Sequence, residues 1–512
     1  MNRKRNMSIP VVAILAFLQA VCCFTGARAD DKFTVYQLSV AGQLLQHWVE
    51  DLDGDGLKDI FVVHRKGVAP EETRWVSIFR QHEELGFATA PDRSWELARE
   101  AAILDIGDVA GDDAQKEIVY STGHNVRYYR FENGSYATDS IELFEARGLT
   151  VYPSRRDIPM VNFVRDWNGD GRDDVAVAGF DGLSIFFRGA DGGYTAPTHV
   201  ALEVETGVAR APGHGVDNKT IGIVVNYEFP SLLMVDANGD TRSDLVAVTE
   251  DRARVFVRHD DRTYSTEPLI DHWFDVRTQQ EKLEGISDVE TQVEDLNNDG
   301  FADAIVVKQT SKGLTSFRGV VNVFWGGPDG FKDVPDQVII SEGTASSRAS
   351  FIDVNGDGRK DLVLPSVKFS VAAVIRILIT RSIKVSFNIF LLGEDGRLAE
   401  RPTFKKEVKF KIDLSGASDE QAMDLKGDYN GDGRTDFVFA TDRDELSVYT
   451  GEIDAGDRLF TKKPVTKVNA DAFGQLQSPD LNGDGFSDMV IYYPQSRDKQ
   501  GIIQVLLNNG RW

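Results

Sequence analysis

The feature that most constrains this chain is an acidic nine-residue loop that recurs along nearly its whole length. In the copy that starts at Asp353, aspartate or asparagine occupies positions 1, 3, 5 and 9, and glycine occupies position 6. Five further copies keep this pattern, another has Thr241 in place of the glycine, and one, which starts at Asp108, is degenerate. The eight copies, numbered here in chain order, start at residues 51, 108, 166, 236, 295, 353, 428 and 480. Such spacing is typical of a repeat protein, in which each repeat is one structural unit.

Short apolar runs accompany every loop. Residues 60–63 follow loop 1 and residues 304–307 follow loop 5, and both runs are rich in β-branched residues, which predicts buried strands. A second run with alternating character comes next, as at 76–79, and a further apolar run precedes the following loop. About four strands in roughly 60 residues is the content of one propeller blade. A row of separate small β-domains is less favoured, because a unit of that size buries too little surface to be stable alone.

We therefore predict an all-β fold, a β-propeller of about eight four-stranded blades. Seven blades is the alternative, if the degenerate unit at Asp108 is absorbed into its neighbours. Residues 34–38 start 17 residues before loop 1, which is the phase of a fourth strand, whereas the unit that ends near Trp512 lacks one. Pairing the N-terminal strand with this last unit would close the ring and remove an open sheet edge.

The first 29 residues are predicted to be a secretory signal peptide. Residues 3–5 are cationic, residues 11–21 are apolar, and residues 27–29 form a small-x-small cleavage site. A signal anchor or an ordinary buried helix is the alternative. Residues 30–512 are then predicted to be a single propeller, in a protein that is secreted to an extracellular, periplasmic or cell-surface location.

Removal of this segment would also remove Cys22 and Cys23, which are the only two cysteines. Disulfides and thiolate metal sites are then excluded from the mature chain, so stability outside the cell must have another source. The chain carries 57 basic and 81 acidic residues, a net charge of −24. This balance argues against nucleic acid and against anionic membrane surfaces as partners.

Residues 366–385 depart from the repeat and form a predicted insert. The run 370–379 is apolar and free of acidic residues. The favoured interpretation is a helix that packs on the propeller, and the alternative is a helix that seeks a membrane or binds a partner. Arg376 and Arg381 interrupt the run well before the roughly 20 apolar residues that span a bilayer, so no transmembrane segment is expected after signal cleavage.

Alternating oxygen ligands in the loops suit a hard cation with six to eight contacts, which is calcium before magnesium. Side chains at positions 1, 3, 5 and 9 are expected to converge on the ion, with the carbonyl of position 7 and a left-handed glycine at position 6. The predicted ligands are Asp51, Asp53, Asp55, Leu57 and Asp59; Asp166, Asn168, Asp170, Arg172 and Asp174; Asp236, Asn238, Asp240 and Asp244; Asp295, Asn297, Asp299, Phe301 and Asp303; Asp353, Asn355, Asp357, Arg359 and Asp361; Asp428, Asn430, Asp432, Arg434 and Asp436; and Asp480, Asn482, Asp484, Phe486 and Asp488.

Two loops are expected to differ from the rest. Thr241 is β-branched where the turn needs positive φ, so loop 4 is expected to bind less tightly or to turn differently. In loop 2, Ala110 removes a ligand and one extra residue precedes Glu117, so a normal site is not expected there. None of the loops is an EF-hand, because the twelfth position is Val62 in loop 1 and Leu364 in loop 6, where an EF-hand has a bidentate glutamate.

With loops such as 353–361, each followed by matching strands over nearly all of residues 33–512, the chain resembles the FG-GAP/VCBS repeat propellers and is similar to the head propeller of integrin α subunits. The resemblance implies several calcium ions in the blade loops, and roles in adhesion or in binding carbohydrate or protein.

The predicted function is a binding, adhesion or scaffold module for an extracellular protein or glycan, in which calcium is structural. The alternative is an extracellular carbohydrate-active enzyme, a polysaccharide lyase or hydrolase, on a propeller scaffold. No nucleophile elbow, His-Glu-x-x-His or phosphate loop is present, and the eight histidines show no metal-ligand spacing, so an enzyme is not expected. A third interpretation is a cell-surface component held through residues 370–379.

Overall fold

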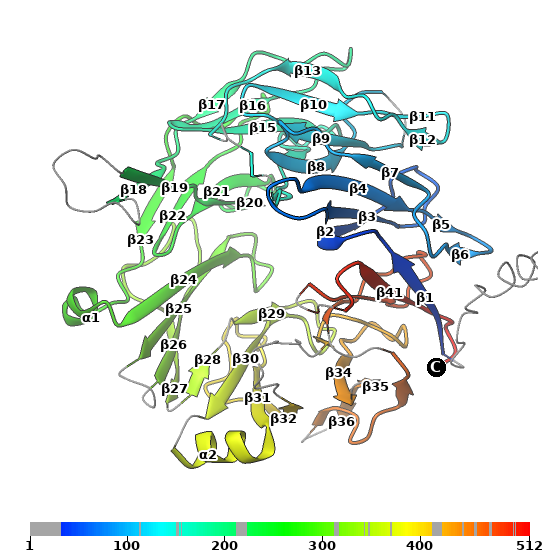
Figure 1. The fold of residues 1–512 in the computed structure, drawn as a ribbon. Helices are drawn as coiled ribbons and strands as arrows, with labels where there is room; N and C mark the ends of the chain where they lie inside the picture. Colours follow the sequence, from blue (N-terminus) through cyan, green and yellow to red (C-terminus); the bar gives the residue numbers. More distant parts are fainter. Residues whose placement is uncertain are drawn as a thin grey trace, which may run out of the picture.

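The computed structural model describes residues 32–512 apart from 112–113, 150–152, 155, 211–222, 312–316, 343, 347–348, 369–370, 412–421, 443–444, 455–457, 471–473, 495 and 497. The chain forms a ring of eight antiparallel sheets (Figure 1). The predicted β-propeller of eight blades is therefore confirmed, and the degenerate unit at Asp108 forms a blade of its own. The predicted signal peptide, residues 1–29, lies outside the described residues.

Blades 1 to 5 and blade 7 each use four strands in chain order, and the blades are numbered here as their loops are. Blades 1 to 4 consist of β2 (Gln43–Glu50), β3 (Asp59–Lys66), β4 (Thr73–Phe79) and β7 (Arg93–Glu96); β8 (Ile103–Gly107), β9 (Glu117–Ser121), β10 (Asn125–Tyr129) and β13 (Ile141–Glu145); β14 (Val164–Arg165), β15 (Asp174–Gly179), β16 (Gly182–Phe186) and β17 (Thr198–Val200); and β20 (Ser231–Val235), β21 (Asp244–Val248), β22 (Arg252–Phe256) and β23 (Ile270–Trp273).

In blade 6 the first strand is divided in two, and in blade 8 the fourth strand comes from the N-terminal end. Blades 5 to 8 consist of β24 (Ser287–Glu294), β25 (Asp303–Ser311), β26 (Phe317–Phe324) and β27 (Gln337–Glu342); β28 (Thr344–Ser346) and β29 (Ser350–Ile352), β30 (Asp361–Lys368), β31 (Ser382–Phe390) and β32 (Phe404–Lys411); β33 (Met423–Asp424), β34 (Phe437–Asp442), β35 (Glu445–Tyr449) and β38 (Thr466–Val468); and β39 (Gln475–Gln477), β40 (Met489–Tyr492), β41 (Ile502–Asn508) and β1 (Phe33–Ser39).

Four short hairpins and two helices lie outside the blade sheets in the described part of the chain. They are the hairpins β5 (Gln81–His82) with β6 (Gly86–Phe87), β11 (Phe131–Glu132) with β12 (Ser135–Tyr136), β18 (Glu205–Arg210) with β19 (Ile223–Glu228) and β36 (Gly451–Asp454) with β37 (Arg458–Phe460), and the helices α1 (Gln279–Glu284) and α2 (Val371–Thr380).

The apolar side chains do not form one central core. They gather in eight clusters, and each cluster is shared by two neighbouring blades around the ring. Because a blade is covered on both faces, most residues of its second strand are buried, and in β21 all five are buried. This explains why the residues that follow the loops are apolar in succession and do not alternate between apolar and polar.

The ring closes through β1, as predicted from its phase. β1 pairs antiparallel with β41, from Phe33 opposite Asn508 to Ser39 opposite Ile502 (Figure 1). Phe33 and Leu38 are fully buried, Phe33 in the cluster between blades 7 and 8 and Leu38 in the cluster between blades 8 and 1. One strand thus completes two of the eight cores.

The predicted insert at 366–385 contains a helix, as expected. α2 packs against β31, and it connects the second and third strands of blade 6. The helix ends where Arg381 takes a left-handed φ of 47° and its N–H donates to the carbonyl of Ile377. Among the described residues, no helix is both long and apolar enough to cross a membrane.

Candidate metal-binding loops

Each acidic loop connects the first strand of a blade to the second. Loop 1 runs from the end of β2 to Asp59, the first residue of β3, and the other loops occupy the same place in their blades. All of them therefore lie on the same face of the ring, because the first strands run in parallel directions around it. Apart from loop 2, the structure repeats one local geometry at these positions.

The aspartate at position 1 organises the turn. In loop 6, Asp353 Oδ1 accepts from Gly356 N at 2.7 Å, and Oδ2 accepts from Gly358 N, also at 2.7 Å. Position 5 then accepts from position 7, with Arg359 N donating to Asp357 Oδ1 at 2.9 Å. The loop is thus shaped by carboxylates that satisfy its own backbone donors, which is the ordinary behaviour of aspartate in tight turns.

The turn residue at position 6 is left-handed in every loop that keeps the pattern. The glycines have φ between 79° and 89°, as predicted. Thr241 takes the same conformation with φ 67°, and its N–H donates to Asp236 Oδ2 at 2.7 Å, as the glycine N–H does elsewhere. Of the two alternatives expected for loop 4, the different turn is not observed, because a hydrogen bond to position 1 accompanies the β-branched residue at positive φ. Weaker binding by loop 4 stays a prediction.

We expect the substitution Thr241→Gly to raise the free energy of unfolding by about 0.5–1 kcal/mol. The left-handed region costs a residue with a Cβ about 1–2 kcal/mol, and the greater freedom of glycine in the unfolded chain offsets only part of this gain. Urea unfolding at fixed calcium measures the change. The reverse substitution in loop 6, Gly358→Thr, is the matched control and should destabilise; an unchanged or lower stability of T241G would contradict the assignment of strain.

Position 4 is a second left-handed position that the sequence reasoning missed. It is glycine in most loops, with φ between 71° and 79°, and Asn298 in loop 5, with φ 57°. The signal was present, since glycine and asparagine are the residues that tolerate this conformation. In the structure this position also faces the next blade: a Cβ added to Gly239 would lie 2.7 Å from the ring of Phe301.

The aspartate at position 9 is buried, and its role is visible in the structure. Asp361 is fully buried, with Oδ2 accepting from Val354 N at 3.2 Å and Oδ1 accepting from Leu392 N at 2.8 Å, just beyond the third strand. Burial raises the pKa of Asp361 to about 7. The same pair of acceptor contacts recurs in the loops of blades 1, 3, 4, 5, 7 and 8, at Asp59, Asp174, Asp244, Asp303, Asp436 and Asp488. Position 9 therefore ties the first, second and third strands of its blade together.

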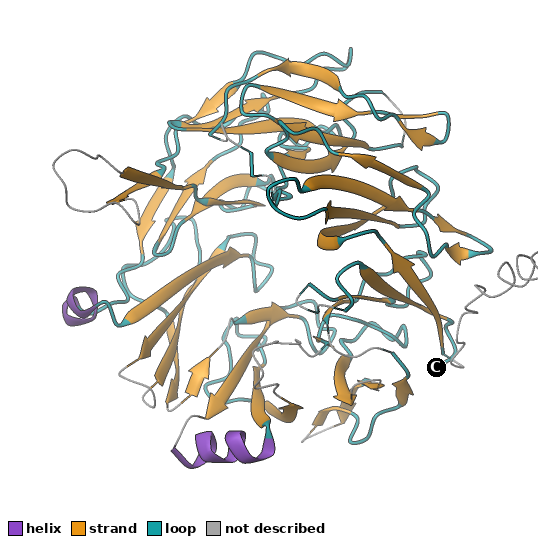
Figure 2. Ribbon diagram, viewed as in Figure 1, coloured by secondary structure: helices purple, strands orange, loops and turns teal. Residues whose placement is uncertain are grey.

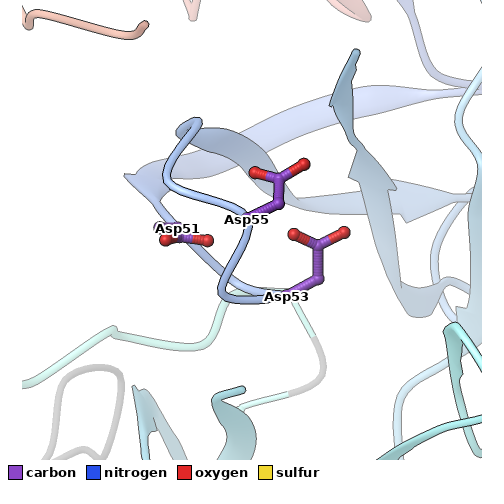
Figure 3. A group of neighbouring side chains, drawn as sticks. All are labelled: Asp51, Asp53 and Asp55. Atoms are coloured by element: carbon purple, nitrogen blue, oxygen red, sulfur yellow. The ribbon is translucent and has the colours of Figure 1, made fainter. Parts of the chain in front are cut away.

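The carboxylates of loop 1 form a group with the geometry of a cation site. Asp51, Asp53 and Asp55 each place one oxygen so that the three lie within 4.8 Å of one another (Figure 3). Asp53 Oδ1 is buried and has no hydrogen-bond partner. A buried anionic oxygen with no partner is costly unless a cation or a donor faces it, so these residues fit an oxygen-liganded metal ion.

Loop 3 shows the same feature at the same position. Asn168 is buried, and its Oδ1 has no hydrogen-bond partner. In loops 1 and 3, position 3 thus leaves one acceptor without a partner, and in loop 3 the position 1 carboxylate is already satisfied by backbone N–H groups. In loops 4 to 8, the asparagine Oδ1 at position 3 accepts from the N–H of position 5.

Arginine side chains approach several loops, which the sequence reasoning did not anticipate. At position 7, Arg242 Nη2 lies 2.6 Å from Asp240 Oδ2, Arg359 Nη2 lies 2.6 Å from Asp357 Oδ2, and Arg172 pairs with Asp170. In loop 1 the arginine comes from elsewhere, with Arg80 Nη1 3.2 Å from Asp53 Oδ2. These guanidinium groups partly neutralise the acidic clusters, and they would have to share the carboxylates with any bound cation. Loops 5 and 8 carry Phe301 and Phe486 at position 7 instead.

Loop 2 is built differently. Arg188, buried and supplied by blade 3, lies 3.0 Å from Asp108 Oδ1 and donates to the Asp108 carbonyl at 2.8 Å. Glu117 takes the place of the position 9 aspartate, and its Oε2 accepts from Val109 N and Ala110 N. A guanidinium group thus supplies positive charge at this loop, and the absence of a normal metal site there stays a prediction.

Neighbouring loops are joined to one another around the ring. Lys58 N of loop 1 donates to Leu481 O of loop 8 at 2.8 Å, and Lys116 N after loop 2 donates to Leu52 O at 3.0 Å. Comparable bonds join loops 6 and 5, 7 and 6, and 8 and 7, the last through Ser487 N and Asp428 O at 2.7 Å. Order in one loop is therefore transmitted to the edge of the next blade.

Two of the histidines are packed inside the ring. His64 is buried, with Nδ1 2.9 Å from the Ala41 carbonyl and Nε2 2.8 Å from Ser77 Oγ. His47 is also buried, against Gln477 of blade 8. Burial lowers the pKa of each to about 4, so both are neutral near pH 7.

A ring of blades with an aspartate-rich turn between the first and second strands defines a repeat β-propeller. A family model described as an FG-GAP-like repeat matches residues 295–364 and 428–491. Over these residues the chain carries FG-GAP-like repeats, and the ring in which they lie is a β-propeller, as the sequence resemblance indicated.

Solved structures that match the chain include an Agrocybe aegerita lectin that recognises non-reducing terminal N-acetylglucosamine, with 15% identity, 94% of this chain and 96% of the lectin covered, and a TM-score of 0.43. Sqt1 from Chaetomium thermophilum has 9% identity, 93% and 100% coverage, and a TM-score of 0.43. The Photorhabdus luminescens Tc holotoxin pore has 15% identity and a TM-score of 0.31, over 88% of this chain and 17% of that one. No curated protein sequence matches the chain.

Proposed function

We propose that this chain is a secreted, calcium-binding propeller in which the metal ions brace the blades and the ring serves as a binding, adhesion or scaffold module. The observation that carries the proposal is loop 1, where Asp51, Asp53 and Asp55 gather and Asp53 Oδ1 is buried without a partner. The same residue pattern recurs in six of the seven other loops.

Side chains at positions 1, 3 and 5 would hold the ion, with the carbonyl of position 7 and the carboxylate of position 9 as the further predicted ligands. Bound calcium supplies positive charge that offsets the repulsion between clustered carboxylates. Because several neighbouring loops are joined by hydrogen bonds, an ion in one of these loops would stabilise the interface between two blades. This role suits a mature chain without cysteine, which has no disulfides to stabilise it outside the cell.

Calcium removal is expected to lower the melting temperature by about 10 °C. An extracellular site with a Kd of about 10⁻⁴ M contributes about 2 kcal/mol at roughly 5 mM calcium, and six such sites act on a chain of this length. Thermal unfolding with calcium and with a chelator measures the shift. An unchanged melting temperature would contradict the proposal.

A single-loop variant sharpens this test. Asp53→Ala should lower the calcium stoichiometry by one, measured by titration calorimetry, because it removes the position 3 ligand of loop 1. The double substitution Glu83→Ala with Glu84→Ala removes two charges outside the loops and should leave the stoichiometry unchanged.

The ligand we propose is an extracellular protein or glycan, bound without catalysis. A glycan array and a polysaccharide-cleavage assay, each with and without calcium, separate a binding module from a carbohydrate-active enzyme. Glycan binding without cleavage products supports the module, whereas calcium-dependent cleavage would establish the enzyme instead.

A further inference from the structure

The helix α2 lies on the outer rim of the ring (Figure 2). It leaves two apolar side chains exposed. Ile375 is 51% exposed and Ile379 is 75% exposed. These residues are four positions apart, so they share one face of the helix. No acidic residue occurs in α2. The helix therefore presents a small apolar ridge that the propeller does not cover.

The strands beside α2 carry a net positive charge, and β32 alone has four lysines and one glutamate. Residues 362–393 contain four basic and no acidic residues. Lys384 of β31 lies directly opposite Lys409 of β32, and both are exposed. Like charges directly opposite each other destabilise a sheet, so the pair is not explained by the stability of blade 6.

One acidic residue is present on this face. Glu407 lies 3.7 Å from both Lys384 and Lys405, so a single carboxylate is shared by two ammonium groups. A hollow of about 210 Å³ lies between the helix and the strands, lined by Arg376, Lys384 and Glu407 among others. The basic groups of α2 and of the sheet thus belong to one continuous surface.

This cationic surface contrasts with the net charge of −24 of the whole chain. The net charge argues against anionic partners only for the molecule taken as a whole. At physiological salt, ions screen the electrostatic potential over about 8 Å, so a partner is affected mainly by the charges next to it. A partner that touches this edge is affected by the local lysines and arginines and little by the acids across the ring. The acidic remainder would orient the molecule with this edge toward an anionic surface.

We infer that α2, β31 and β32 form a docking surface for an anionic lipid bilayer. Ile375 and Ile379 would enter the boundary between headgroups and acyl chains, while Arg376, Lys384, Lys405 and Lys409 would contact the headgroups. The exposed isoleucines favour a bilayer over a soluble polyanion, because a polyanion offers nothing for apolar side chains to enter. An apolar helix face flanked by basic residues is the general design of interfacial membrane attachment.

Sedimentation with vesicles tests the inference at fixed calcium. The full chain should bind vesicles of phosphatidylcholine with about 30% phosphatidylglycerol and not pure phosphatidylcholine vesicles, and binding should fall as salt rises. The double substitution Lys384→Glu with Lys409→Glu should weaken binding by roughly tenfold or more, since it replaces two attractive charges with two repulsive ones. Lys462→Glu with Lys463→Glu, an exposed pair on blade 7, is the matched control and should bind as the natural chain does.

The apolar contribution is tested separately. Ile375→Ser with Ile379→Ser should weaken vesicle binding severalfold, whereas Val338→Ser with Ile340→Ser, exposed on β27, should not. With Cys22 and Cys23 replaced by serine, a single cysteine at Ile379 carrying an environment-sensitive fluorophore should shift to the blue on anionic vesicles, and one at Val338 should not. Binding to neutral vesicles as strong as binding to anionic vesicles would overturn the inference. Binding to heparin that is as strong for the isoleucine variant as for the natural chain would also overturn it. Either failure would leave the calcium proposal untouched, because the loops lie elsewhere on the ring.

Discussion

Replacing Asp361 by alanine is expected to lower the free energy of unfolding by about 2–4 kcal/mol, with or without calcium. The carboxylate accepts from Val354 N and Leu392 N at a fully buried position. Its removal leaves two buried backbone donors without acceptors, each worth about 1–3 kcal/mol. Asp361→Asn should lose less, because the amide oxygen can still accept one of the two bonds. Urea unfolding at constant pH measures both variants.

The comparison that matters is with position 5 of the same loop. Asp357 is partly exposed and bonds mainly within its own turn, so Asp357→Ala should cost about 1 kcal/mol or less in chelator. In calcium the cost of D357A should grow, because a proposed ligand is lost. Equal losses for the two variants in chelator would show that Asp361 has no special structural role. If D361A lowered the free energy of unfolding only in calcium, position 9 would act as a metal ligand and not as a structural tie between strands.

The second large effect is expected at the closing strand. Deleting residues 33–39 should abolish cooperative unfolding at the natural midpoint, because β41 loses its partner and two of the eight interblade clusters lose a member. The single substitution Phe33→Ala should lower the free energy of unfolding by about 3–5 kcal/mol, since the phenyl group of Phe33 is fully buried against Tyr429 and Trp512. Urea unfolding followed by circular dichroism measures both changes.

The control lies on the same strand. Gln37 is exposed, so Gln37→Ala should change stability by less than about 0.5 kcal/mol. A synthetic peptide covering residues 32–40, added to the truncated chain, should restore part of the lost stability if the strand acts by pairing. A truncated chain that unfolds with the midpoint and cooperativity of the full chain would refute the closure mechanism.

Much of the architecture was predictable because the same pattern of loop and strands occurs eight times in the sequence. The apolar runs after the loops marked the second strands, and the phase of residues 34–38 identified a fourth strand without a local partner. The left-handed position 6 was predictable from glycine alone. Position 4 could have been found in the same way, since glycine or asparagine occupies it in every loop that keeps the pattern.

Other features could not be predicted, because they join residues far apart in the sequence. The arginine that faces loop 2 is Arg188, 80 residues after Asp108. Thr241 was expected to weaken binding or to alter its turn, since local propensity disfavours a β-branched residue there, and the structure keeps the turn with a bond to Asp236. The surface around α2 depends on β31 and β32 placing Lys384 opposite Lys409, a register that the sequence does not display.

The sequence by itself determined the repeat, the strand content, the position of the acidic turns and the way the ring closes. These follow from residue type and spacing, which act through local backbone preference and through burial of apolar runs. The tertiary structure decided what each aspartate does: position 9 is buried and ties three strands, whereas positions 1, 3 and 5 shape the turn and leave the acceptor at Asp53 without a partner. Burial and the contacts between neighbouring loops made that distinction, and neither exists until the eight blades are packed side by side.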